Sequence, residues 1–272
     1  MRTRIITGSA KLVRDGRGGV VIGSDAAPNR PVRLVRRTVL SLAFAFMGAA
    51  WCHSAGAWVA LDVGHTLEKP GASSARGRVE FEFNRTLAME IARALRRENV
   101  AARIINADGL IGSLGARAAA AQGAQLLIAV HHDSVQPHFL AGWMVAGTEQ
   151  RYSPERFRGF SLFVSRRARA LPGGLRCASA IGVALRGAGL APSLYHAEQI
   201  AGEFKPFADR ANGVHYFDNL AVLKAATMPA LLLEAGVIVN RDEELQLQDP
   251  ARVAMMAASV ARGVAQCLAP RK

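Results

Sequence analysis

The chain has 272 residues, of which 50% are hydrophobic and 6% aromatic, and its formal net charge at pH 7 is +13. This length fits one domain of ordinary size with an N-terminal leader, and the composition suits an alanine-rich α/β core. The sequence has no nucleic-acid-binding motif of the kind that combines aromatic and basic residues, so nucleic acid is not an expected partner.

Residues 1–57 are predicted to be a leader that is removed from the mature protein. Residues 1–37 are basic, and the apolar run at 39–50 is followed by the small residues Ala55-Gly56-Ala57. A basic region, a short apolar region and an A-x-A site are typical of a secretory signal, with cleavage after Ala57. A retained membrane anchor is the less favoured alternative, because about a dozen apolar residues are too few to span a bilayer comfortably. We therefore expect a periplasmic or secreted protein with no stable membrane span after cleavage.

Several features of the leader leave alternatives open. The part before Arg36-Arg37 is unusually long for a signal, which a start codon assigned too far upstream would explain. The arginine pair itself could mark export of a folded protein. Cys52 stands near a lipoprotein position, but the bulky Trp51 before it fits such a site poorly. Without the leader only Cys177 and Cys267 remain, and two cysteines permit one disulfide without requiring it.

Residues 58–272 are predicted to form a single α/β domain. Apolar runs of strand length occur at 58–63, 101–105, 126–131, 143–147 and 230–234. Helical patterns lie near 80–98, 114–122, 158–170, 175–188 and 249–268. Strands that alternate with helices predict a twisted, mostly parallel sheet with helices on both faces. Functional side chains in such sheets gather beyond the carboxyl ends of the strands.

Four short stretches each place a histidine or a carboxylate at the end of an apolar strand or at the start of a helix. They are Leu61-Asp62-Val63-Gly64-His65, Glu80-Phe81-Glu82-Phe83-Asn84, Ala129-Val130-His131-His132-Asp133-Ser134 and Leu231-Leu232-Leu233-Glu234-Ala235-Gly236. Catalytic zinc requires three protein ligands and one open position for water. Two histidines, one glutamate ligand and a further glutamate as base satisfy this need, so the four stretches together predict a zinc hydrolase with its site at the carboxyl ends of the strands.

From about Val59 to the last helix, the chain resembles the zinc-dependent N-acetylmuramoyl-L-alanine amidases, which cut the stem peptide from the glycan of peptidoglycan. The motifs that carry the resemblance are Asp62-Val63-Gly64-His65 for Asp-Pro-Gly-His, Gly71-Ala72 for a Gly-Ala pair, Glu80 with Asn84 at a helix start, His131-His132-Asp133 for His-x-Asn, and Pro229 to Asn240 for Pro-Ala-x-Leu-x-Glu-x-Gly followed by Asn. Val63 in place of proline and Thr66-Leu67 in place of a glycine pair affect the expected shape of the first loop but not the ligands.

The resemblance implies one zinc ion per chain, bound by His65, Glu80 and His131, with Glu234 as the catalytic acid/base. The substrate would be peptidoglycan or its fragments, and the protein is expected to be a monomer. In some relatives an inserted helix plugs the site until a partner removes it, so a regulatory protein activator stays open. Here the corresponding stretch at 189–216 is short and polar, and a substrate-binding loop is the favoured interpretation.

The residues next to the expected ligands leave further alternatives open. Glu82 competes with Glu80, since both lie near the helix start, although only Glu80 has the family spacing to Asn84. His132 should face the opposite side of its strand from His131 and is expected at the rim of the site or behind a ligand. Asp133 could orient a ligand histidine or form a turn.

Three other polar residues stand at family-like positions, where capping or ion pairing would explain them equally well: Asp108, Arg117 and Asn240. Glu234 differs from them because it ends a very apolar strand, where desolvation raises the pKa of a carboxyl group toward the range of a general base. The alternative functions are an inactive amidase-like domain that binds or regulates at the cell wall, and a zinc hydrolase of another amide.

Overall fold

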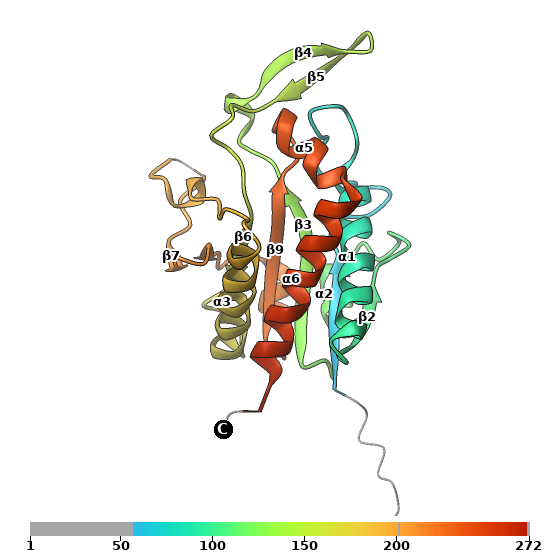
Figure 1. The fold of residues 1–272 in the computed structure, drawn as a ribbon, viewed down its shortest axis with the longest axis vertical. Coiled ribbons are helices and arrows are strands. Elements are labelled where there is room, and N and C mark those ends of the chain that lie inside the picture. The colour runs from blue at the N-terminus through green and yellow to red at the C-terminus, as the bar shows by residue number, and fades with distance from the viewer. Residues whose placement is uncertain (1–56, 201, 271–272) are drawn as a thin grey trace, which may run out of the picture. The chain divides into compact units, whose positions relative to one another are not determined.

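The computed structural model describes residues 57–200 and 202–270 (Figure 1). The predicted leader at 1–57 and its cleavage site therefore lie outside the described residues, apart from Ala57. Within the described part, no helix is both long and apolar enough to cross a bilayer.

A seven-stranded mixed sheet forms the centre of the domain, with the strand order β2-β1-β3-β9-β6-β8-β7. Its strands are β1 (Trp58–Val63), β2 (Ala101–Ile105), β3 (Leu126–Asp133), β6 (Ser161–Val164), β7 (Phe207–Asp209), β8 (Val214–Tyr216) and β9 (Ala230–Val237). The four strands from β2 to β9 are parallel, β6 is antiparallel to β9, and β8 is parallel to β6. The single α/β domain and its largely parallel sheet agree with the prediction.

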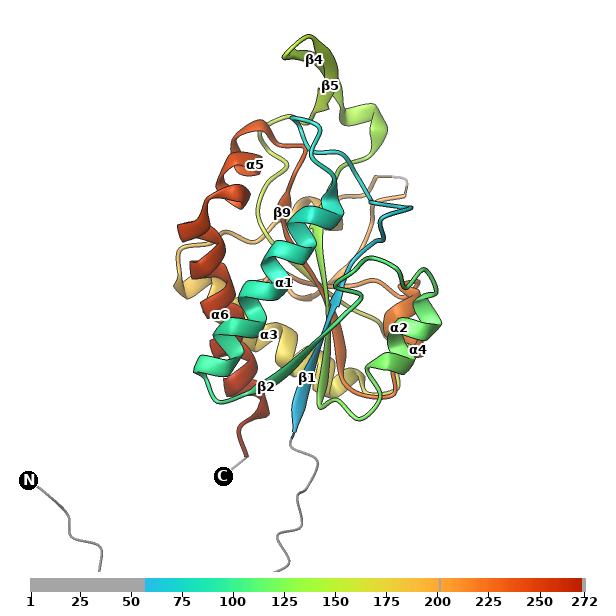
Figure 2. The same cartoon turned by 90° about the vertical axis from the view of Figure 1, so that its right-hand side faces the viewer.

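Helices cover both faces of the sheet, as Figure 2 shows. One face carries α1 (Glu80–Arg97), α3 (Leu171–Gly187), α5 (Arg241–Gln248) and α6 (Pro250–Leu268), and the other carries α2 (Leu114–Ala120) and α4 (Ala221–Ala225). Two short 3-10 helices, η1 (Pro137–Phe139) and η2 (Tyr195–Ala197), lie in the connections.

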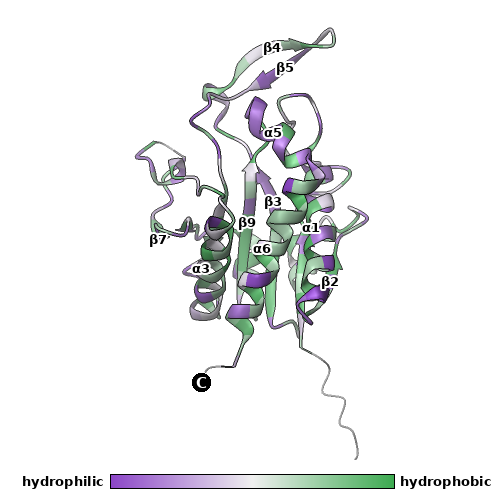
Figure 3. Cartoon of the chain, viewed as in Figure 1, coloured by the Kyte–Doolittle hydropathy of each residue, from purple (hydrophilic) through white to green (hydrophobic). Residues whose placement is uncertain are grey.

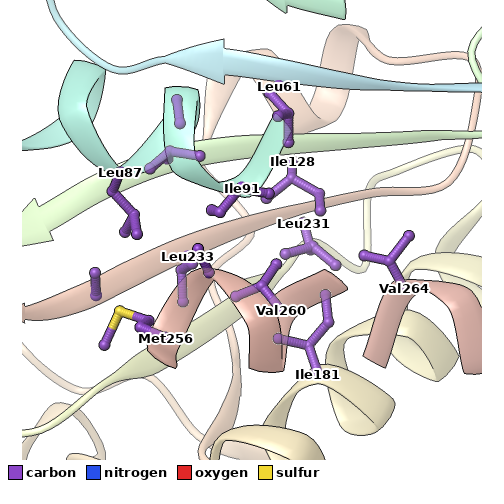
Figure 4. Packing of buried hydrophobic residues seen from close by; sticks show 14 of the residues in the cluster. Leu61, Leu87, Ile91, Ile128, Ile181, Leu231, Leu233, Met256, Val260 and Val264 are labelled. Carbon is purple, nitrogen blue, oxygen red and sulfur yellow. The ribbon is translucent and has the colours of Figure 1, made fainter. Parts of the chain in front are cut away.

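The larger core cluster fills the space between the sheet and helices α1, α3 and α6 (Figure 4). Leu61, Ile128 and Leu231 of neighbouring strands pack there against Ile91 of α1 and Val260 of α6. A second cluster packs the opposite face against α2 and α4. Strands buried on both faces need apolar residues at successive positions, which is why the central strands read as continuous apolar runs and are drawn mostly in the apolar colour in Figure 3.

A disulfide joins Cys177 of α3 to Cys267 at the end of α6, with their Cα atoms 5.0 Å apart. The sequence permitted this bond without requiring it. Because α6 ends at the amino-terminal edge of the parallel strands, the disulfide lies at the edge opposite to the carboxyl ends of β1, β3 and β9 (Figure 1).

Two predicted elements differ in the structure. The helix predicted at 158–170 is wrong, because Ser161–Val164 pairs with β9 as strand β6 and the helix starts only at Leu171. The strand predicted at 143–147 exists as β4 (Ala141–Val145), but it forms a separate hairpin with β5 (Thr148–Tyr152). Positive φ angles at Ala146 and Gly147 make the tight turn between them.

Candidate metal centre

Three of the predicted site residues meet at the carboxyl edge of the parallel strands. His65 follows the end of β1, His131 lies near the end of β3, and Glu80 is the first residue of α1. His65 Nε2 lies 2.8 Å from Glu80 Oε2, and His131 Nδ1 lies 3.0 Å from Glu80 Oε1. One ligand atom from each of the three residues lies within 4.8 Å of the others. Two imidazole nitrogens and a carboxylate are donors that suit catalytic zinc, so the cluster fits the metal predicted from the sequence.

Glycine is required at two positions that touch these side chains. A Cβ atom at Gly64 would lie 2.4 Å from the His131 ring, and one at Gly71 would lie 2.4 Å from Glu80 Oε2. Gly71 also has a φ of +85°, a conformation that other residues rarely adopt. The loop after β1 can therefore approach the candidate ligands only because both residues lack a side chain.

The backbone of His65 has a φ of +68°, which is uncommon for a residue other than glycine, and two buried side chains hold it. Asn106 Nδ2 donates to the carbonyl oxygens of Val63 at 2.8 Å and His65 at 2.7 Å. Arg117 Nη1 donates to Val63 O at 2.9 Å, its Nη2 donates to His65 O, and its Nε donates to Ile111 O at 2.8 Å. Arg117 thus fixes the loop that carries a candidate ligand.

Arg117 also lies beside a buried carboxyl group. Its Nη1 is 3.6 Å from Asp62 Oδ1. Burial raises the pKa of Asp62 to about 6, although the charges of Arg117 and His131 act in the opposite direction. The family-like position of Arg117 therefore has a structural role next to the metal centre.

Glu80 is held in its charged form by several donors. Asn84 Nδ2 donates to Glu80 Oε1 at 3.1 Å, and the backbone N–H of Ala72 donates to Oε2 at 3.2 Å. Burial acts to raise the pKa of Glu80, but hydrogen bonds from His131 and His65 lower it far below its usual value. An anionic carboxylate between two histidines is the state that a metal ligand needs.

His132 faces away from the candidate ligands, as strand alternation predicted. It packs toward α1, where its Nδ1 lies 2.8 Å from Asn84 Oδ1. It is buried rather than at the rim, and it acts behind the site because Asn84 in turn contacts Glu80. Glu82, the alternative to Glu80, is exposed and pairs with Arg78 at 2.9 Å, so it is not part of the cluster.

Glu234 lies on β9 directly beside His131 of β3 in the strand register. Its Oε2 atom is buried and has no hydrogen-bond partner among the described residues. Burial raises the pKa of Glu234 well above its usual value, and the nearby charges of Asp133 and Glu80 raise it further. This carboxyl group is therefore suited to accept and release a proton rather than to remain permanently charged.

Asp133 belongs to a hydrogen-bond network that was not among the two roles expected for it. Its Oδ2 accepts a hydrogen bond from the hydroxyl of Tyr195 and lies 2.8 Å from His196 Nε2. His196 Nδ1 lies 2.6 Å from Glu203 Oε1, and Gln136 Nε2 donates to Glu203 Oε2 at 3.0 Å. The expected turn is also present, because Asp133 Oδ1 accepts from the N–H of Ser134 at 2.8 Å, whereas no contact with a ligand histidine is seen in the described part of the chain.

The sequence contained only a partial signal for this network. The polar segment at 189–216 was interpreted as a substrate-binding loop, and His196 and Glu203 of that segment line a hollow beside Glu234. Of the remaining family-like residues, Asn240 caps α5 by accepting from the N–H of Glu243 at 3.0 Å, and Asp108 accepts from the N–H of Leu110 at 3.2 Å. Both have local structural roles.

Comparison with known proteins decides the family. A model of the N-acetylmuramoyl-L-alanine amidase family, Amidase_3, matches residues 59–266. The chain belongs to this family. Among curated protein sequences none matches the chain.

Solved amidase structures share the fold of this family member. The amidase Ami1 from Mycobacterium smegmatis is 20% identical with a TM-score of 0.61, and the match covers 78% of this chain and 97% of that one. The catalytic domain of CwlV from Bacillus (Paenibacillus) polymyxa var. colistinus is 21% identical with a TM-score of 0.58, again over 78% and 97% of the two chains. The amidase CwlD from Clostridioides difficile, solved in complex with the GerS lipoprotein, is 14% identical with a TM-score of 0.57, over 78% and 98%.

Proposed function

We propose that this amidase-family chain is a zinc-dependent N-acetylmuramoyl-L-alanine amidase that cleaves the amide bond between N-acetylmuramic acid and L-alanine in peptidoglycan. The observation that carries the proposal is the cluster of His65, Glu80 and His131 beside Glu234 on the adjacent strand, whose buried Oε2 has no hydrogen-bond partner among the described residues. Family membership supports the choice of bond and polymer.

His65, Glu80 and His131 would hold the zinc ion. Bound zinc supplies Lewis acidity toward the scissile carbonyl and makes water a better nucleophile at neutral pH. Glu234 accepts the proton of the attacking water as the new C–O bond forms, and it passes that proton to the amine as the C–N bond breaks. The products are the carboxylic acid of the muramic lactyl group and a peptide with a free amino group.

The first test separates the base from the ligand. Glu234→Gln keeps the shape of the side chain but cannot accept a proton, so it should retain zinc and lose amidase activity by a factor of about 10²–10⁴. Glu80→Gln replaces an anionic ligand by a neutral one and should weaken zinc binding. Glu82→Gln is the matched control, because Glu82 lies on the same helix and points to solvent, and it should change neither property.

The measurements are zinc content by elemental analysis, and the ends released from purified sacculi and from soluble muropeptides, identified by mass spectrometry. An active enzyme without metal would contradict the mechanism. Loss of zinc in Glu234→Gln together with retention in Glu80→Gln would require the two roles to be exchanged. Release of ends other than lactyl carboxylate and free L-alanine would refute the proposed bond.

The same proposal includes export, because the substrate lies in the cell wall. Signal cleavage after Ala57 would leave Trp58, the first residue of β1, at or within a few residues of the mature N-terminus. Terminal sequencing of the exported protein tests this, and residues 1–37 still attached would rule it out. A regulatory partner protein stays a prediction of the resemblance. The neighbour CwlD was solved in complex with the GerS lipoprotein.

A further inference from the structure

Two adjoining hollows flank the metal centre. The first, of about 390 Å³, is lined by both His65 and His131 but not by Glu234. The second, of about 170 Å³, is lined by Glu234 but by neither His65 nor His131. They share Leu220 and Leu232, so a substrate placed over the metal centre would extend into both.

The position of Glu234 assigns a direction to the substrate. In the proposed reaction Glu234 gives its proton to the leaving amine, so the amine and the peptide attached to it must lie on the side of Glu234. The peptide therefore enters the second hollow, and the lactyl and sugar part lies over the first. At about 170 Å³, the second hollow is below the roughly 300 Å³ at which small-molecule pockets begin. It has room for only the part of the peptide next to the scissile amide.

Most charged groups of the second hollow already have partners. Both ring nitrogens of His196 contact carboxylates, namely Asp133 at 2.8 Å and Glu203 at 2.6 Å. Burial acts to lower the pKa of His196, but the adjacent carboxylates of Asp133 and Glu203 outweigh it and raise the pKa above its usual value. Neither the ring nor these carboxylates is free to bind a charged ligand.

Apart from Glu234, the proposed acid/base, Lys205 is the charged residue of this hollow that keeps a donor for a ligand, although it too pairs with Glu203. Its Nζ donates to Glu203 O at 2.9 Å and to Glu203 Oε1 at 3.2 Å, so the third of its N–H donors has no partner among the described residues. The ammonium group lies 4.9 Å from the centre of the Phe217 ring, and its side chain is 13% exposed. The contacts to Glu203 and Phe217 fix the ammonium group at the boundary with a third hollow of about 330 Å³, which shares Glu203, Lys205 and Phe217 with the second.

We propose that Lys205 binds a carboxylate of the peptide part of the substrate, on the residue that follows the L-alanine, and so selects acidic over neutral peptides. The Asp133–His196–Glu203 network acts as the support that holds Lys205 in this position. This inference rests on the proposed amidase function, because that function places the peptide beside Glu234. A pre-positioned ammonium group that lacks one partner suits a carboxylate, since charge-assisted hydrogen bonds are the strong ones.

The test compares two synthetic substrates with the zinc-loaded full chain. They are N-acetylmuramoyl-L-alanyl-D-glutamate and its diamide, which differ only in whether the carboxylates of the second residue are free. Lys205→Met removes the charge but keeps an apolar stem against Phe217. Lys205→Arg keeps the charge. Lys69→Met removes a cation that lines the first hollow, and Lys224→Met removes an exposed cation of α4 that lines neither.

We expect Lys205→Met to lower kcat/KM for the glutamate substrate by about 10- to 100-fold and for the diamide by less than about threefold. Lys205→Arg should keep most of the preference for the acid. Lys69→Met should leave the ratio of the two substrates unchanged, and Lys224→Met should leave both rates unchanged. Equal losses on both substrates in Lys205→Met, or a ratio that collapses in Lys69→Met instead, would overturn the assignment.

A binding measurement keeps this test apart from the proposed reaction. Calorimetric titration of the product peptide L-alanyl-D-glutamate requires no turnover, and its affinity should fall in Lys205→Met by a factor similar to that in kcat/KM. If the wild-type chain cleaved neither substrate yet bound the peptide through Lys205, the proposed function would fail while the carboxylate site would stand. Equal peptide affinity of wild type and Lys205→Met would refute the carboxylate site.

Discussion

Arg117→Met tests whether a residue outside the ligand set prepares the metal centre. Arg117 is buried, donates hydrogen bonds to the carbonyl oxygens of Val63, His65 and Ile111, and lies 3.6 Å from Asp62 Oδ1. Methionine fills part of the same space with an apolar side chain. The substitution therefore removes the donors and the positive charge while it keeps much of the packing.

The structure sets the expected magnitude. Removal of one partner from a buried charge pair costs about 3–5 kcal/mol, because the other partner is left without compensation. Asp62 would be that partner, and the pKa of its carboxyl group, already about 6, should rise further without the cation that lowers it. Asn106 would still hold the carbonyl oxygens of Val63 and His65. We therefore expect a folded but less stable protein in which His65 is held less firmly and zinc affinity falls by about 10–100-fold, as for other residues that support metal ligands.

Two measurements check this prediction independently of activity. Urea unfolding of the zinc-free protein gives the loss in the free energy of unfolding, and competition with a chromophoric chelator gives the zinc affinity. Arg93→Met is the control, because Arg93 is exposed on α1 and, in the part of the chain that the structure describes, its ion pair is with Glu90 alone. If Arg117→Met lost less than about 1 kcal/mol of stability and bound zinc as tightly as the control, the support that we assign to Arg117 would be refuted.

Two further predictions concern stability. Replacing both Cys177 and Cys267 by serine removes a crosslink between residues 90 apart in sequence, which should lower the free energy of unfolding by about 4–5 kcal/mol on the chain-entropy estimate. Because the disulfide lies at the edge of the sheet opposite to the metal centre, zinc affinity should not change. Weaker zinc binding in the double variant would contradict this prediction. Burial lowers the pKa of His215 to about 4, below its unfolded value of about 6.5, so its neutral form stabilises the fold above pH 6.5 and this contribution is lost as the pH falls toward 4. His215→Gln should flatten the decline in Tm over that pH range, and an unchanged decline would show that other groups cause it.

The sequence was sufficient to predict the parallel half of the sheet and the residues that meet at its carboxyl edge. Apolar runs at β1, β3 and β9 are long enough to identify strands buried on both faces. Parallel strands bring their carboxyl ends to one edge, so the polar residues that follow β1 and end β3 had to lie near one another. The strand pattern therefore predicts that His65 and His131 lie together, and the structure brings them into one cluster.

The other half of the sheet could not be predicted in the same way. β6, β7 and β8 have three or four residues each, and their conformation is decided by pairing with distant segments rather than by local pattern. The Asp133–His196–Glu203 network joins Asp133 to residues more than 60 positions away in the sequence, so no spacing rule could reveal it. The sequence showed only that the segment is polar.

Glu80 and Glu234 show how two carboxylates at one site come to have different proposed roles. Glu80 accepts hydrogen bonds from Asn84 and from the backbone of Ala72 and lies between two histidines, so its charged form is stabilised and it can remain a ligand. Glu234 has a buried oxygen with no donor among the described residues, and burial together with the charges of Asp133 and Glu80 raises its pKa. Opposite pKa shifts in neighbouring carboxylates separate a permanently charged group from a proton carrier. The sequence motifs do not reveal this difference in pKa, because each of them is only a glutamate at the end or start of an element. The difference arises from hydrogen-bond donors that the fold places beside Glu80 but not beside the buried oxygen of Glu234.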